Sequence, residues 1–184
     1  MTLTEIRWHG RAGQGVITVS RLLAQSAISE GKHAQAFPEF GPERIGAPIA
    51  GFTRISDEPI RIHSRIYEPD IVVVLDPTVL KIVNTTEGLK PGGGYVVNMN
   101  PEDKFKAAVP KAKTFTIDAT RISLDVLGNA RALNTIMLGA LIKTSKLVSM
   151  ESIVNSLKER FSGPILEKNL ILVQRGFEEV EELH

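Results

Sequence analysis

A short apolar segment near the middle of the chain most constrains the fold. Residues 71–75 read Ile-Val-Val-Val-Leu, an unbroken run of apolar and mostly β-branched side chains. A strand with one face in water alternates apolar and polar residues, so a continuous run is typical of a strand covered by helices on both faces. Asp76 and Pro77 follow, a pair that suits the start of a helix. The segment therefore predicts a central strand in a sheet flanked by helices.

The N-terminal residues predict a strand, a glycine-rich turn and a helix in succession. Residues 4–8 alternate like a strand, glycines recur from Gly10 to Gly15, and residues 16–30 have apolar side chains at helical spacing. Residues 33–37 can form a second strand, which would complete a right-handed βαβ unit. The chain therefore opens as an α/β protein does.

The remaining segments complete this pattern. Residues 50–55 and 60–63 read as two strands of a hairpin, because the four residues between them are rich in turn formers. Further strands are expected at residues 95–99 and 114–117, and helices at 119–127, 132–143, 150–161 and 165–183. We predict a single domain over residues 1–184. Its fold would be α/β, with a doubly wound, mostly parallel but mixed sheet flanked by helices, a β-hairpin excursion and a helical C-terminal third.

The composition excludes several classes of function. The chain has no cysteine, which rules out disulfides, thiolate zinc sites and cysteine-ligated clusters within it. Its four histidines are scattered, so no metal site is expected. A net charge of +1 gives no general attraction to nucleic acid. No signal peptide or membrane span is predicted, and the protein is expected in the cytoplasm.

The glycine turn is the first candidate binding site. It reads His9-Gly10-Arg11-Ala12-Gly13-Gln14-Gly15 and precedes a helix, where backbone N–H groups and the helix dipole favour an anion such as phosphate. A dinucleotide-binding turn would need glycine instead of Ala12, and an ATP-binding P-loop would need lysine instead of Val16. Two interpretations stay open: contact with an anion or cofactor, or glycines that only permit a tight turn and close packing.

The second candidate is a loop rich in proline, glycine and aromatic residues. It reads Phe37-Pro38-Glu39-Phe40-Gly41-Pro42-Glu43-Arg44-Ile45-Gly46-Ala47-Pro48. Proline limits the entropy lost on docking, Phe37 and Phe40 offer apolar anchors, and Arg44 can bind a carboxylate or phosphate. Such a segment suits an interface or an active-site wall. The alternative is an Ω-like loop packed on its own domain, with Arg44 neutralised by Glu39 or Glu43.

Three isolated polar residues are weaker candidates. Asp76 and Asp118 each follow a predicted strand, and both are interpreted as helix N-caps. Asn134 lies within an apolar helix and could reach a ligand or partner, or bond to nearby backbone. No Ser-His-Asp spacing, nucleophile elbow or pair of catalytic carboxylates is evident, so an autonomous hydrolase is not predicted.

These segments together resemble the gamma subunits of pyruvate:ferredoxin oxidoreductases, within the 2-oxoacid:ferredoxin oxidoreductase family. The resemblance rests on residues 10–16 and 37–48, and it extends to Tyr67-Glu68-Pro69-Asp70, Leu75-Asp76-Pro77, Asp118-Ala119-Thr120, and Asn134 with Met137-Leu138-Gly139. The glycine turn is shared by gamma subunits for several 2-oxoacids, whereas residues 37–48 are similar to the pyruvate branch. Ala12 is a departure, because related chains often have glycine there, and it narrows the backbone freedom of the turn.

The resemblance implies a subunit that is not catalytic alone. The complex would convert pyruvate and coenzyme A to acetyl-CoA and carbon dioxide and pass two electrons to ferredoxin. Thiamine diphosphate, Mg and 4Fe–4S clusters would belong to the partner alpha, beta and delta subunits. Gly13, Gln14 and Gly15 would contact coenzyme A or a subunit, and the interface would involve Phe37, Glu39, Phe40, Glu43 and Arg44. The alternatives are a gamma subunit for a branched-chain or aryl 2-oxoacid, and a stand-alone nucleotide- or coenzyme A-binding module.

Overall fold

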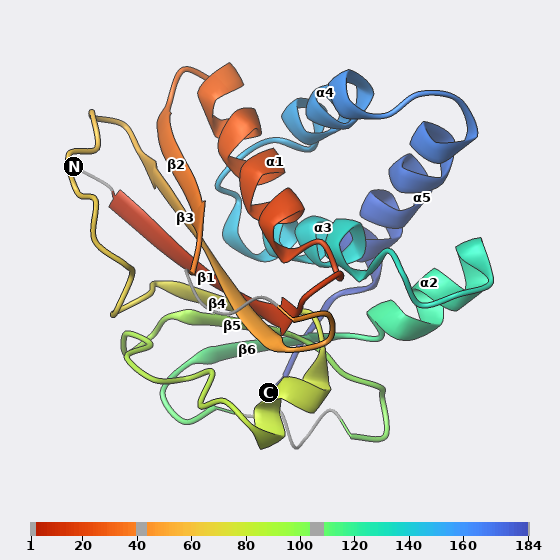
Figure 1. Ribbon diagram of the computed structural model, residues 1–184, viewed down its shortest axis with the longest axis horizontal. Coiled ribbons are helices and arrows are strands. Elements are labelled where there is room, and N and C mark those ends of the chain that lie inside the picture. The colour runs from red at the N-terminus through yellow and green to blue at the C-terminus, as the bar shows by residue number, and fades with distance from the viewer. Residues whose placement is uncertain (1–2, 40–43, 104–108, 184) are drawn as a thin grey trace.

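A seven-stranded mixed sheet forms the centre of the computed structural model, which describes residues 3–39, 44–103 and 109–183 (Figure 1). The strands are β1 (Leu3–Arg11), β2 (His33–Pro38), β3 (Pro48–Ser56), β4 (Ile71–Val74), β5 (Gly94–Asn98), β6 (Lys113–Ile117) and β7 (Glu181–Glu182). Their order across the sheet is β2-β3-β1-β4-β5-β6-β7. β1, β4, β5 and β6 form a parallel core, and the other pairs are antiparallel. The predicted mixed α/β sheet is confirmed.

The α-helices of the described chain gather on one side of this sheet (Figure 1). They are α1 (Val16–Ser29), α2 (Ala119–Leu127), α3 (Leu133–Ser145), α4 (Met150–Arg160) and α5 (Gly163–Glu179). α1 lies against β1, β2 and β3, while α3 lies against β5 and β6 and also contacts α1 and α5. The opposite face packs against a short 3-10 helix, η1 (Pro77–Lys81), and against irregular segments that follow β3 and η1. The predicted helical C-terminal third is confirmed, whereas the helices expected on both faces of a doubly wound sheet differ, because the α-helices of the described chain lie on one face and η1 with irregular segments covers the other.

The centre of the sheet has the two-sided burial that its sequence predicts. In β4, Val73 packs into the cluster beneath the helices, whereas Val72 and Val74 pack into the cluster on the opposite face. Asp76 then accepts a hydrogen bond from the N–H of Thr78 and caps η1, at 2.9 Å. Both the buried strand and its capping residue are therefore confirmed.

Two details of the strand pairing differ from the prediction. Residues 60–63 are not a strand, because β3 already pairs with β2 on one edge and β1 on the other. A side chain holds the segment after β3 in place of a ladder: Arg54 Nη2 donates to Ser64 O at 2.7 Å. The antiparallel excursion is the β2–β3 pair. β2 also does not lie beside β1, since β3 is inserted between them.

Trp8 fixes the inserted strand against α1. Its indole Nε1–H donates to Thr53 Oγ1 at 3.0 Å, and the Thr53 hydroxyl donates to the Ser20 carbonyl of α1 at 3.2 Å. All three residues are buried, so each polar group needs a partner. This chain of bonds positions the end of β1, where the glycine turn begins.

α3 and α5 cross at unusually close range because each has a glycine at the crossing. A Cβ atom added to Gly139 of α3 would overlap the carbonyl oxygen of Val173. One added to Gly176 of α5 would overlap the carbonyl oxygen of Ile136. The obstacle is backbone in both cases, so the crossing accepts only glycine at these two positions.

Candidate functional site

The glycine turn and the segment before β3 form one surface at the carboxyl end of β1. The N–H of Ala12 donates to Ala47 O at 2.9 Å, and the N–H of Gly46 donates to Ala12 O at 3.2 Å. Arg11 Nη1 donates to Gly46 O at 2.8 Å. β2 and β3 lie on one side of β1 and β4 on the other, so this is the point where α/β sheets commonly bind ligands. Two segments singled out separately in the sequence thus become one candidate site.

Gln14 ties the turn to the end of β4. Its Oε1 accepts from the Arg11 N–H at 2.8 Å, and its Nε2 donates to Asp76 Oδ2 at 2.7 Å. Burial favours the neutral form of Asp76, but hydrogen bonds from Thr78 and Gln14 and the nearby Arg11 charge outweigh it and hold its pKa below the usual value. The Gln14 side chain therefore shapes the turn from within. The exposed backbone at Gly13 is then the part of the turn that a ligand or partner can reach.

The two glycines around Gln14 have left-handed backbone angles. Gly13 has φ 96° and is exposed, with open space where a Cβ would stand. Gly15 has φ 75°, and a Cβ there would overlap the side-chain amide of Asn134. Gly15 is the N-cap of α1, and no side chain caps that helix end. The first N–H groups of α1 are thus without a side-chain partner, which is the arrangement that suits an anion.

Replacing Gln14 with alanine is expected to destabilise the chain by about 1–2 kcal/mol, because two hydrogen bonds with partly buried partners are lost. Urea unfolding at neutral pH measures this change. Gln174 provides the matched control, because its described side-chain hydrogen bond goes to the exposed Glu178 one helical turn away. Equal midpoints for the Gln14→Ala and Gln174→Ala variants would show that Gln14 does not support the turn.

The predicted interface residues occupy different environments. Phe37 packs inward, with its ring centroid 5.2 Å from that of Phe52, and Glu39 forms an ion pair with Arg65. Arg44 is exposed, and the neighbouring Ile45 is 100% exposed. Phe40 and Glu43 lie outside the described residues. Among the described residues of the loop, the exposed ones are Arg44, Ile45 and Pro48, and Ile45 was not singled out in the sequence.

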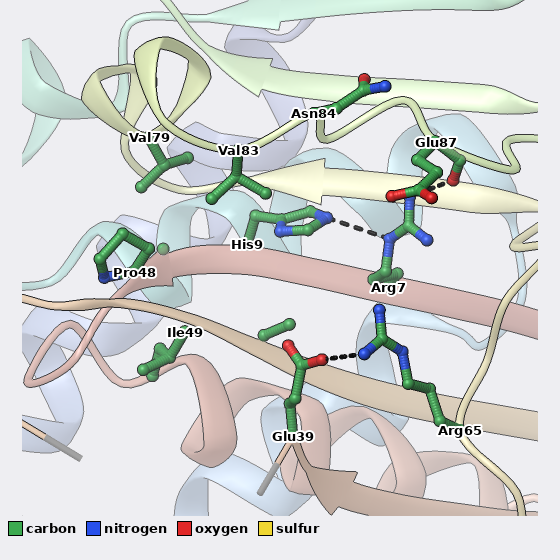
Figure 2. A pocket seen from close by; sticks show the side chains of 12 residues that line it. Arg7, His9, Glu39, Pro48, Ile49, Arg65, Val79, Val83, Asn84 and Glu87 are labelled. Carbon is green, nitrogen blue, oxygen red and sulfur yellow. Dashed lines mark hydrogen bonds and ion pairs between the residues drawn. The ribbon is translucent and has the colours of Figure 1, made fainter. Parts of the chain in front are cut away.

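A small cavity of about 90 Å³ with both polar and apolar walls lies next to this surface, on the face of the sheet away from the α-helices (Figure 2). Arg7 and His9 of β1 line it, and both are buried. Arg7 Nε donates to His9 Nε2 at 3.0 Å, and its Nη2 donates to the carbonyls of Thr85 and Glu87 at 3.0 and 2.6 Å. Burial, together with the charges of Arg7 and Arg65, lowers the pKa of His9 to about 3. His9 is therefore neutral at physiological pH.

Sequence reasoning did not single out Arg7 and included His9 only as the first residue of the glycine turn, although a signal for both exists. They alternate with Ile6 and Trp8 in β1, so they share the face of the strand opposite to those apolar side chains. A charged residue at an alternating position of a buried strand indicates a polar site. Residues 83–87 close the cavity over Arg7 from about 80 positions further along the chain, and the alternating pattern within β1 cannot reveal such a distant contact.

Comparison with known proteins decides the family. The family model described as pyruvate ferredoxin/flavodoxin oxidoreductase matches residues 5–179. The chain belongs to this family. The gamma subunit common to the pyruvate and ketoisovalerate oxidoreductases of Thermococcus kodakarensis is 48% identical over 178 residues, 95% of this chain and 96% of that one. The pyruvate synthase subunit PorC of Methanothermobacter thermautotrophicus is 45% identical and covers 98% of each chain.

A solved structure supports the same membership in the pyruvate ferredoxin/flavodoxin oxidoreductase family. The crystal structure of the pyruvate oxidoreductase subunit PORC from Thermotoga maritima matches with a TM-score of 0.87 and 38% sequence identity, over 100% of both chains. The resemblance that the glycine turn and residues 37–48 indicated is therefore confirmed.

The residues of this family member do not fit an iron–sulfur cluster, because the sequence has no cysteine. Within residues 3–39, 44–103 and 109–183, no three His, Asp or Glu side chains gather in a way that could hold a metal ion. None of the helices in the described part of the chain is long and apolar enough to cross a membrane.

Proposed function

We propose that this chain is the gamma subunit of a pyruvate:ferredoxin oxidoreductase. The complex converts pyruvate and coenzyme A to acetyl-CoA and carbon dioxide and reduces ferredoxin. The observation that carries the proposal is similarity over nearly the whole chain, at 45–48% identity, to proteins named as common gamma subunits or as PorC. The chain acts as one gamma-type domain in the cytoplasm and does not catalyse the reaction alone.

Partner subunits supply the redox and thiamine chemistry in this proposal. Clusters need cysteine thiolates, which this chain lacks, so the 4Fe–4S clusters belong to the alpha, beta or delta chains. The sequence also lacks a Gly-Asp-Gly stretch of the kind that holds thiamine diphosphate and Mg in the family. Ferredoxin is reached through the assembled complex.

The surface at the carboxyl end of β1 is the part of the chain that faces coenzyme A or a partner. The exposed backbone at Gly13 and the uncapped start of α1 after Gly15 offer N–H groups to a phosphate of coenzyme A. Gln14 contributes by holding the turn through Asp76. In this proposal the backbone of the glycine turn contacts the ligand or partner, and the Gln14 side chain supports the turn.

The similar proteins also support a second candidate function, in a complex that acts on a branched-chain 2-oxoacid. Four of the similar proteins are described as subunits common to pyruvate and ketoisovalerate oxidoreductases, with 46–48% identity to this chain. A gamma subunit that serves two complexes would not choose the 2-oxoacid itself. Under this candidate function, the same chain also completes an oxidoreductase for a branched-chain 2-oxoacid.

Affinity purification of the tagged chain from its anaerobically grown native host tests the proposal. We expect companion chains that carry thiamine diphosphate and clusters to co-purify, with pyruvate- and coenzyme A-dependent reduction of ferredoxin. Assaying ketoisovalerate in parallel separates the two substrate classes. Recovery of the chain alone, with tight coenzyme A binding and no such activity, would favour a stand-alone binding module.

Replacing Ile45 with aspartate is expected to weaken assembly with the companion chains by about tenfold or more, because a fully exposed apolar side chain is replaced by a carboxylate that would have to lose water at the interface. The change leaves the free chain's stability unaltered. Ile165→Asp is the matched control, since Ile165 is 62% exposed on α5. Pull-down titration compares the two variants, and equal affinities would remove this loop from the interface.

A further inference from the structure

Arg7 is a buried cation whose described hydrogen bonds all go to neutral groups. Arg7 is only 4% exposed. Its hydrogen-bond partners are the His9 ring and the main-chain carbonyls of Thr85 and Glu87. Carbonyl oxygens solvate a guanidinium but carry no full negative charge. A buried charge is costly unless negative groups are near. The carboxylates of Glu87 and Glu39 favour the charged form of Arg7 through space, but none of its described hydrogen bonds goes to them. A small anion in direct contact with the guanidinium would therefore add an ionic hydrogen bond that the described contacts do not supply.

His9 adds a second donor beside it. Because Nε2 accepts the hydrogen bond from Arg7, a neutral ring must carry its hydrogen on Nδ1. The ring borders the cavity, as Figure 2 shows. Among the polar groups that line the cavity, the guanidinium of Arg7 and the imidazole N–H of His9 lie side by side on β1, and both donate. A ligand that lies between these two donors would therefore need to be a hydrogen-bond acceptor.

The rest of the cavity restricts the size and charge of that acceptor. Ile49, Ala50 and Val79 form apolar walls, and the volume of about 90 Å³ holds only a few heavy atoms. Two carboxylates stand among the lining residues: Glu39, which is paired with Arg65, and the exposed Glu87. They disfavour a multiply charged anion such as phosphate. A group with one negative charge, planar oxygens and a short apolar stem fits these walls.

We propose that this cavity is a carboxylate-binding site, in which Arg7 and His9 donate to the carboxylate oxygens and a stem of one or two carbons lies against Ile49, Ala50 and Val79. The carboxylate can come from a free small molecule or from an acidic side chain of a companion subunit. The second source rests on the proposed assembly. The first does not, so the two can be tested separately.

The first test uses the full chain with acetate as the probe. Acetate should produce saturable changes in the NMR signals of the His9 ring and the Arg7 side chain in the millimolar range, whereas chloride at equal ionic strength should not.

Arg7→Gln should weaken acetate binding about tenfold or more, because a charge-assisted hydrogen bond is lost. Ala50→Val should do the same by filling the cavity while leaving both donors in place, and its unfolding midpoint reports that the fold is intact. Arg21→Gln, an exposed change on α1, is the charge-matched control and should bind like the wild type.

The second test uses the assembled complex. If the carboxylate belongs to a companion subunit, Ala50→Val should assemble about tenfold more weakly than the wild type, and acetate should compete with assembly. An acetate response lost in Ala50→Val, or an assembly defect in that variant, supports the site. Equal acetate responses in all variants would mean that acetate binds elsewhere, which would overturn the proposal. The proposal would also fail if acetate caused no response and the Ala50→Val variant assembled as well as the wild type. Failure of the wild-type chain to assemble would contradict the proposed function but leave the acetate test decisive.

Discussion

Replacing Gly176 with alanine is expected to lower the free energy of unfolding by about 3 kcal/mol, and replacing Gly139 should cost a similar amount. The added methyl group of either variant would overlap a carbonyl oxygen of the facing helix. Flexible side chains can move aside, but backbone within a helix moves only if the two helices separate. That separation would also loosen the cluster of buried side chains beneath α3, which includes Ile136 and Leu172.

Urea unfolding at neutral pH measures this loss, and Gly94→Ala is the matched control. Gly94 begins β5, its added Cβ would meet Ile71 at an ordinary 3.5 Å, and its backbone is not left-handed. The same glycine-to-alanine change should therefore have little effect there. If Gly176→Ala unfolds at the urea concentration of Gly94→Ala, α3 and α5 do not cross at the distance described.

Lowering the pH from 7 to 5 is expected to destabilise the folded chain by about 2 kcal/mol through His9 alone. Burial first, and then the charges of Arg7 and Arg65, lower the pKa of His9 from 6.5 to about 3. Below pH 6.5 the unfolded chain takes up a proton that the folded chain does not bind, so acid favours unfolding. The loss continues until the pH reaches about 3, where the folded state also becomes protonated.

A His9→Asn variant isolates this contribution, because asparagine does not titrate and retains an oxygen that can accept from Arg7. The difference in unfolding free energy between wild type and variant should shrink or reverse as the pH falls from 7 to 5. Glu30 acts in a separate window, since its pKa is lowered from 4.5 to about 2 and its stabilisation is lost only below pH 4.5. A constant difference between the two proteins over pH 5–7 would mean that His9 is not held neutral.

The features that could be predicted from sequence are those set by neighbouring residues. The apolar run before Asp76 identified the central strand, and both Asp76 and Asp118 cap the helices that follow them. Strand burial and helix capping depend on side chains within a few positions of one another, so the local pattern contains the information. The glycine turn was recognised as a candidate site for the same reason.

The features that could not be predicted depend on distant partners. Residues 60–63 have strand-like composition, but the edge of β3 that they would need is taken by other strands. Gln14 was expected to contact coenzyme A or a subunit, and no local pattern indicates that its amide donates to Asp76, 62 positions away. The cavity lined by Arg7 and His9 was not predicted, because a second segment, far along the chain, closes it over them. Pattern within one strand does not specify such pairings.

The contact between Gly15 and Asn134 has a consequence for how the protein is made. These residues lie 119 positions apart, and the Asn134 amide approaches the carbonyl of Gly15 at 3.5 Å. Most of the chain must therefore leave the ribosome before the turn near its beginning can settle against α3. A translation product that stops short of α3 would display an unsupported turn. Docking through this surface would thereby disfavour chains that stop before α3.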